Sequence, residues 1–164
     1  MKIHQITEAE TGPGQSLPKQ IKVAKIPTPP PAPTGPDGTG EDGTRIGTTP
    51  KGNRSVKNGA GTYIFTPTGK LMLYMTPKMA GLQQTHNIPK QRITVNFGTT
   101  AQGATIDQKA TYDMSGKLIS GDNTSIRNGD LGVSIDKDKG ASIDYKLNKD
   151  TKVSVNSKTG VKVN

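Results

Sequence analysis

From residue 104 onwards, the chain alternates short runs of apolar residues at every second position with polar turns. Leu131, Val133 and Ile135 form one such run, and Val153 and Val155 belong to another. Turn sequences rich in Gly, Asn and Asp separate the runs, and a spacing of about 8–12 residues between turns is typical of antiparallel sheets. The expected turns are 114–117, 128–130, 136–140, 148–150 and 156–160. The pattern therefore predicts a mainly β protein whose short antiparallel strands form a meander, a sandwich or a β-prism.

The apolar content of the chain limits how much core it can build. Leu, Ile, Val and Phe make up 30 of 164 residues, or about 18%, which is below the ~20% level where an independent hydrophobic core becomes doubtful. Each expected strand carries only a few small apolar residues, and a thin single sheet is marginally stable in water. We therefore expect other copies or neighbouring proteins to complete the sheet.

A basic hairpin module is expected over residues 61–103. The apolar segments 62–66 and 71–75 flank a turn that contains Pro67 and Gly69, a favourable hairpin signal. Residues 92–97 alternate strictly between polar and apolar, which predicts another strand. The segment 77–89 between them is expected to be a loop or a single helical turn. The β-strand repeat region then occupies residues 104–164.

Residues 1–60 are expected to form an extended arm, because nine of the twelve prolines lie there. The run 26–35 favours polyproline II, and the stretch 35–47 is rich in Gly, Asp and Thr without apolar periodicity. We expect the arm to be disordered unless a partner orders it. The residues expected to bind neighbouring subunits are the apolar ones of the arm and of the hairpin: Ile3, Ile6, Leu17, Ile21, Val23, Tyr63, Phe65, Leu71, Leu73 and Tyr74. Within the arm, the alternation of Ile21 and Val23 suggests a short strand.

The net charge of +9 is concentrated in the middle of the chain, since no acidic residue lies between Asp42 and Asp107. Such a block can contact an acidic protein surface or nucleic acid, here through residues 43–106; the alternative is ordinary solubilising charge. The basic patch expected on this ground consists of Arg45, Lys51, Arg54, Lys57, Lys70, Lys78, Lys90 and Arg92.

The sequence contains no recognisable catalytic, metal or cofactor site. There is no Cys, and the two histidines, His4 and His86, have no carboxylate near them in sequence. We interpret His86 as an exposed loop residue and the segment 136–140 as a hairpin turn rather than a calcium loop. We therefore expect no enzymatic activity, no metal, no cofactor and no small-molecule substrate. The first residues lack the apolar stretch of a signal peptide, and no segment is apolar enough to span a membrane.

The whole chain resembles small structural proteins of tailed-bacteriophage virions. The features that carry this resemblance are the short amphipathic start Met1-Lys2-Ile3-His4-Gln5-Ile6-Thr7-Glu8, the Pro/Gly arm, and strands rich in Thr, Asn, Asp and Lys without Cys or Trp. The resemblance implies a non-enzymatic role at the tail, the portal vertex or the capsid surface of a virion assembled in the host cytoplasm.

Three functional hypotheses follow. The first is a structural or assembly component of a virion that binds other virion proteins and copies of itself through its arm and its edge strands. The second is a basic protein associated with the nucleic acid of the virion or ejected with it. The third is a trimeric receptor-binding tail tip.

Overall fold

The computed structural model describes residues 17–101, 103–136 and 138–164, and among these it contains strands but no helix. The strands are β1 (Gly38–Thr39), β2 (Arg45–Thr48), β3 (Arg54–Asn58), β4 (Gly61–Phe65), β5 (Leu71–Met75), β6 (Leu82–Asn87), β7 (Arg92–Phe97), β8 (Thr99–Ala101), β9 (Ala104–Asp113), β10 (Leu118–Asn128), β11 (Leu131–Asp136), β12 (Gly140–Lys146), β13 (Lys152–Asn156) and β14 (Gly160–Val163).

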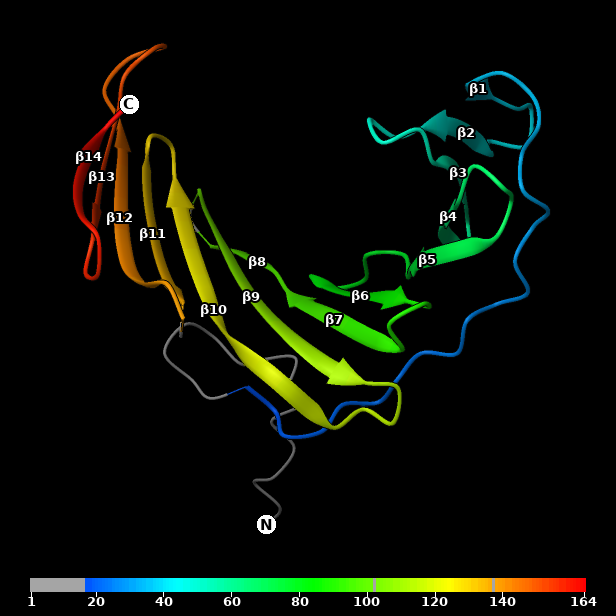
Figure 1. Ribbon diagram of the computed structural model, residues 1–164, viewed down its shortest axis with the longest axis horizontal. Coiled ribbons are helices and arrows are strands. Elements are labelled where there is room, and N and C mark those ends of the chain that lie inside the picture. Colours follow the sequence, from blue (N-terminus) through cyan, green and yellow to red (C-terminus); the bar gives the residue numbers. More distant parts are fainter. Residues whose placement is uncertain (1–16, 102, 137) are drawn as a thin grey trace.

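All of these strands belong to one antiparallel sheet in which neighbours along the chain are neighbours in space. The exception is β8, which lies off the main path and pairs only with β9. The sheet bends into an open U, with β14 at one tip and β1 at the other (Figure 1). Irregularities between β9 and β10 and between β4 and β5 shift the register locally, and such bulges increase the bend and twist of a strand pair. The mainly β prediction is confirmed, and the architecture is a meander.

The expected hairpin and turns are present. β4 and β5 pair with Tyr63 opposite Tyr74, and the turn between them is closed by a hydrogen bond of 2.8 Å from the Thr66 amide to the Lys70 carbonyl. Ile93, Val95 and Phe97 of β7 are all buried on one face, as their alternation predicted. Each of the five turns predicted after residue 104 separates two consecutive strands.

Two predictions of irregular structure are wrong. The arm does not extend to residue 60, because β1, β2 and β3 lie within residues 38–58. Ile46 of β2 opposes Val56 of β3, so each strand contributes one apolar residue, too few to produce a visible alternation. The segment 77–89 is also not a loop or helical turn, since it contains β6, whose inward positions include the polar residues Gln84 and His86.

The extended arm is therefore residues 17–37, and it follows the outside of the curved sheet from the β9–β10 end to β1 (Figure 1). Leu17, Ile21 and Val23 pack against a core cluster of Ile93, Val95, Phe97, Ala110 and Tyr112. Farther along, Ile26 and Ala32 pack against a second cluster of Val56, Tyr63, Phe65 and Tyr74. The arm thus covers its own sheet. The strand expected at Ile21 and Val23 is absent, and the pairing there is one isolated bridge between Gln20 and Lys117.

Candidate interaction surface

Directly opposed residues of antiparallel strands project from the same face of a sheet. Followed from strand to strand, this pairing shows that one face is mainly apolar across most of the strands. In the first half of the sheet, this face carries a continuous row in which each residue opposes the next: Ile46, Val56, Tyr63, Tyr74, His86, Ile93 and Tyr112. In the second half, the same face carries a corresponding row: Ile106, Ile126, Val133, Ile143, Val155 and Val161. The two halves differ in what lies on top of them.

In the first half, hydrogen bonds fix the arm to the sheet. The side-chain amide of Gln84 accepts a bond of 2.8 Å from the Ala24 amide and donates one of 2.8 Å to the Lys22 carbonyl. The hydroxyl of Tyr112 donates to the Pro18 carbonyl at 3.1 Å. Gln84 thereby satisfies the backbone of an extended segment that has no strand neighbour, which explains a nearly buried glutamine on a mainly apolar face.

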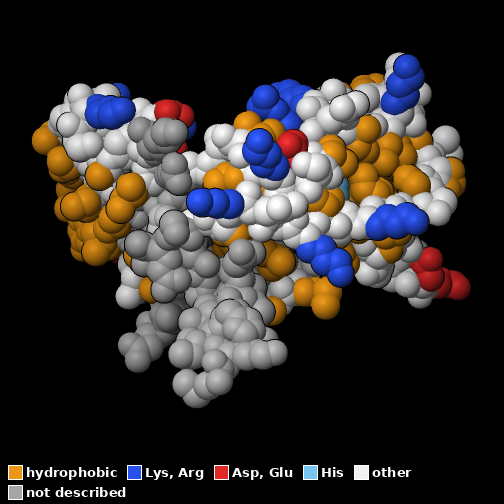
Figure 2. Space-filling view, turned by 90° about the horizontal axis from the view of Figure 1, so that it is seen from below, with side chains coloured by type: hydrophobic (Ala, Val, Ile, Leu, Met, Phe, Trp, Pro, Cys, Tyr) orange, Lys and Arg blue, Asp and Glu red, His pale blue; other side chains and the backbone are white. Residues whose placement is uncertain are grey.

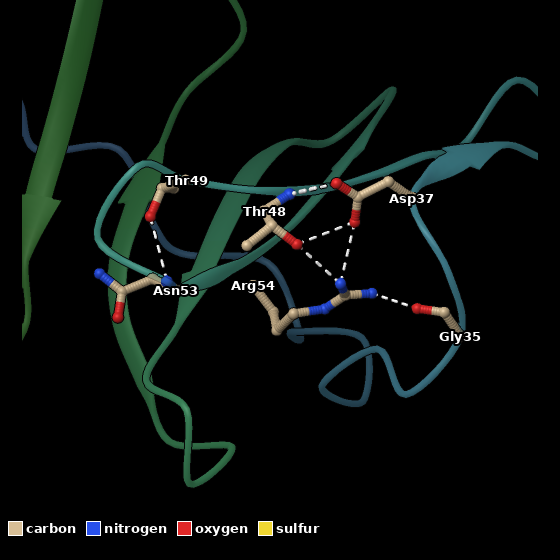
Figure 3. A network of polar contacts seen from close by, with 6 residues as sticks. All are labelled: Gly35, Asp37, Thr48, Thr49, Asn53 and Arg54. Carbon is tan, nitrogen blue, oxygen red and sulfur yellow. Dashed lines mark hydrogen bonds and ion pairs between the residues drawn. The ribbon is translucent and has the colours of Figure 1, made fainter.

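The end of the arm is held by a polar network around Arg54 (Figure 3). The guanidinium group of Arg54 forms an ion pair of 2.9 Å with the Asp37 carboxylate and also donates to the Gly35 carbonyl. Asp37 accepts two further hydrogen bonds from Thr48, one from its amide and one from its hydroxyl, at 3.0 and 2.9 Å. Arg54 therefore contributes to closing the arm, and its charge is already paired.

Two glycines allow the arm to approach the sheet closely. A Cβ on Gly116 would lie 2.2 Å from the Ile21 carbonyl oxygen, and Gly116 also has a positive φ of 89°. A Cβ on Gly121 would lie 2.6 Å from a methyl carbon of Leu17. The backbone of Ile21 bonds there directly, its amide donating to the Gly116 carbonyl at 2.9 Å. The sequence thus provides space for the arm where it crosses β9 and β10.

His86 lies in the middle of this covered face, so its interpretation as an exposed loop residue is wrong. Its ring is fully buried beside Tyr74, with ring centroids 5.5 Å apart. Neither of its ring nitrogens has a hydrogen-bond partner among the described residues. Burial lowers the pKa of His86 below its ordinary value of 6.5, because the charged ring would lose its hydration.

In the second half, the apolar face is uncovered. We call the apolar side of β11–β14 the open face. It carries two rows of residues that oppose one another across the strands, with Ile135 beside them. The first row is Leu131, Tyr145, Val153 and Val163, and the second is Val133, Ile143, Val155 and Val161. Figure 2 shows hydrophobic side chains gathered at the end of the molecule where Figure 1 places these strands. Ile143 is 52% exposed and Val161 is 67% exposed, whereas Ile93 in the covered half is completely buried.

The opposite side of β11–β14 is polar and suited to water. Asp144 forms ion pairs with Arg127 at 2.6 Å and with Lys152 at 3.3 Å. Burial alone would raise the pKa of Asp144, but the hydrogen bonds and charges of these two residues lower it overall. The strands β11–β14 therefore have one polar face, which is compatible with water, and one face that is apolar but exposed. Contiguous apolar patches of this kind mark interaction sites.

A second feature of this region is the free edge of the last strand. Within the described part of the chain, β14 pairs with β13 and has no neighbour on its other side. All four of its residues are exposed. An unpaired strand edge presents backbone amides and carbonyls to which another strand can add.

The structure places the residues predicted to bind partners largely inside the protein. Tyr63, Phe65 and Tyr74 are buried core residues, so they are not available to a partner. Leu71 packs against the same core cluster, and Leu73 is half-buried on the other face of the sheet. Leu17, Ile21 and Val23, predicted to bind a neighbouring subunit, pack against the first core cluster of this chain. Ile3 and Ile6 lie outside the described residues.

The predicted basic patch is divided among several places. Arg54 is on the covered face, while Arg45 and Lys57 oppose each other on the other side of β2 and β3. Lys51, Lys70 and Lys90 are exposed in the turns after β2, β4 and β6. Because successive strands are antiparallel, these three turns lie at the same rim of the sheet. Lys78 lies in the turn after β5, at the opposite rim, and Arg92 is exposed on β7.

The sequence prediction of partner-binding residues did not include the residues of the open face, although the sequence contains a pattern that indicates them. The alternation of residues 131–163 predicted strands, and their small apolar count predicted completion by partners. The aromatic hairpin residues drew attention because they are larger, yet large aromatic residues in alternation more often form a core. The decisive information is that the arm stops short of the last strands, and no local pattern encodes that.

The remaining functional features are few. Among the described residues, no group of three or more His, Cys, Asp or Glu side chains is placed to hold a metal ion. The described part of the chain also contains no helix long and apolar enough to cross a membrane. Comparison of the chain with known protein families, curated proteins and solved structures found no match.

Proposed function

We propose that this chain is a non-enzymatic structural component of a tailed-phage virion, attached to neighbouring subunits through the open face and the free edge of β14. The observation that carries the assembly role is the open face: Ile143, Tyr145 and Val155 stay about half exposed, whereas Tyr63, Ile93 and Tyr112 on the same face are completely buried. The virion assignment is supported by the resemblance of the arm and strands to small virion proteins.

The arrangement of polar and apolar groups supports docking rather than ligand binding. The open face carries no charged or catalytic side chain, since Asp144, Lys152 and Lys162 all project from the other side. Apolar surface of this type gains free energy when water is removed from it by a complementary apolar surface. A thin sheet also gains the most from this burial, because it has little core of its own.

Incorporation into particles tests this proposal. We expect the chain to be present in virions purified from infected cells and the double variant Ile143→Lys/Val155→Lys to be present at least about tenfold less, because two charges would be buried on docking. The matched control is Ser142→Lys/Ser154→Lys, which places the same charges at neighbouring positions on the solvent face. The proposal is wrong if the wild-type chain is missing from purified particles, or if both double variants are incorporated equally well.

A second candidate function, binding of nucleic acid within the virion, is favoured by the lysine rim. This rim consists of Lys51, Lys70 and Lys90, and each of these lysines lies two strands, or roughly 10 Å, from the next. They belong to a block of the chain that has no acidic residue. Binding to duplex DNA at low salt that weakens steeply with added salt would support it. The triple variant Lys51→Gln/Lys70→Gln/Lys90→Gln should then lose that binding, and undetectable binding of the wild type would exclude this function.

A further inference from the structure

We infer that the partner on the open face is the open face of a second copy of this chain. This inference deepens the proposed function, which requires only that some subunit dock there. Four observations on the described residues lead to it: the absence of charge on the face, its area, the distribution of charge over the chain, and the position of the arm.

The open face has the composition of a self-complementary surface. Its two cross-strand rows consist of Val, Ile and Leu with one tyrosine, and every charged side chain of β11–β14 lies on the opposite face or in a turn. A partner with a charged patch would bury unpaired charge there. The same face of another copy matches it, and contacts of this kind, in which one patch meets itself, are the rule in two-fold homodimers.

The area of the face fits a stable interface. Seven of its nine residues are between 44% exposed (Leu131) and 67% exposed (Val161), and Val133 and Val153 are partly buried. Together they present on the order of 700 Å² to solvent, close to the ~800 Å² that each partner buries in a standard protein interface. Two stacked sheets lie about 10 Å apart and their inner side chains interdigitate, so the small side chains of the two rows suit this kind of packing.

The charge distribution allows two copies to meet at this end. Residues 104–164 carry ten basic and eight acidic residues, so their net charge is only +2, whereas residues 43–106 carry +8. Pairing through the C-terminal strands places the strongly basic blocks of the two copies at the far ends of the assembly. Repulsion between the copies is then reduced by distance and by salt screening.

The arm of the same chain cannot occupy the open face. Leu17, Ile21 and Val23 are committed to the first core cluster, and Ile26 and Ala32 are committed to the second. Hydrogen bonds to Gln84 and Tyr112 fix the arm in that position. The open face therefore remains without cover from residues 17–37.

Sedimentation equilibrium of the purified full-length chain tests the inference. We expect a mass of two or more copies at micromolar concentration, and we expect Val155→Lys to shift the midpoint of association by at least tenfold in concentration. Ser154→Lys, its neighbour on the solvent face of β13, should leave the midpoint unchanged. Circular dichroism of both variants verifies that each keeps its strand content.

A single-copy mass at all accessible concentrations overturns the inference, as does association that both variants retain equally. If the full-length chain is monomeric and a variant without residues 1–16 associates, the start of the chain covers the face, and the inference is equally wrong. These outcomes are independent of the proposed function. If the chain is a monomer whose open face binds another virion protein, the Ile143→Lys/Val155→Lys variant would still be incorporated less into virions than the wild type.

Discussion

The two halves of the sheet share an apolar face but differ in whether another part of the chain covers that face. In both, one face carries a row of apolar residues that crosses from strand to strand. In the first half, an arm of about twenty residues covers this row, and Tyr63, Ile93 and Tyr112 are completely dry. Over β11–β14, in the second half, the described residues leave it exposed, and Val161 and Val163 are two-thirds exposed. The comparison shows that an extended, proline-rich segment can take the place of a second sheet layer.

The largest expected effect concerns the apolar rows themselves. Ile93→Ala, in the covered half, should lower the free energy of unfolding by about 2–5 kcal/mol, because it leaves a cavity under the arm. Ile143→Ala, in the open half, should cost less than about 1 kcal/mol in the monomer, because that side chain is already half exposed. Urea denaturation followed by circular dichroism, at the lowest usable protein concentration, gives both values. Equal losses would show that the two halves do not differ as described.

The next effect isolates the arm. Gly116→Ala should destabilise the protein by about 1–3 kcal/mol, because the added methyl group collides with the Ile21 carbonyl. The matched control is Gly160→Ala, a turn glycine with a similar positive φ of 77° and no atom within 4 Å of the new methyl group. Hydrogen exchange should speed up at the Ile21 and Ala24 amides in the first variant alone. If both variants behave alike, the close approach of the arm has no energetic consequence.

The covered half should also show a pH-dependent effect that arises from His86. Burial lowers the pKa of His86, so the unfolded chain takes up a proton at this residue more readily than the folded chain does. The free energy of unfolding should therefore be highest above pH 6.5 and fall as the pH drops below that value. Phe at this position keeps a ring beside Tyr74 but cannot titrate. The difference in free energy of unfolding between His86→Phe and the wild type should shift in favour of His86→Phe as the pH falls from 7.5 to 5.5. A difference that does not change with pH would contradict the burial of His86.

The smallest effect is expected at the end of the arm. Asp37→Ala removes the ion pair with Arg54 and two hydrogen bonds from Thr48. Because the Asp37 side chain is 53% exposed, the loss should be about 1 kcal/mol or less. The effect on hydrogen exchange should be local, limited to residues near Gly35 and Thr48. A loss as large as that of Ile93→Ala would mean that the polar network, not the apolar row, holds the arm.

Strand content and turns could be predicted from the sequence because they depend on local chemistry. The Pro67–Gly69 turn, the alternation of Ile93, Val95 and Phe97, and the five later turns each lie within a few residues of one another. β2, β3 and β6 were missed for an equally physical reason. The inward positions of β2 and β3 include one apolar residue each, and those of β6 include the polar residues Gln84 and His86.

The interaction surface could be predicted only in part, because its identity depends on long-range contacts. The low apolar content predicted that partners complete the sheet, and that remains a prediction for the exposed rows of β11–β14. Whether Tyr74 or Val155 is the exposed residue depends on where the arm runs, and Gln84 binds Ala24 across sixty positions of the chain. The sequence of residues 17–37 shows an extended segment but not the surface on which it lies.

Thiol labelling tests the central difference between the covered half and the open half most directly, since the natural chain has no cysteine. Val95→Cys places one thiol on the covered face, and Val155→Cys places one on the open face. At nanomolar concentration, we predict that the thiol at position 155 reacts at nearly the rate of a free cysteine, while the thiol at position 95 reacts at least a hundredfold more slowly. Equal reactivity at the two positions would contradict the account.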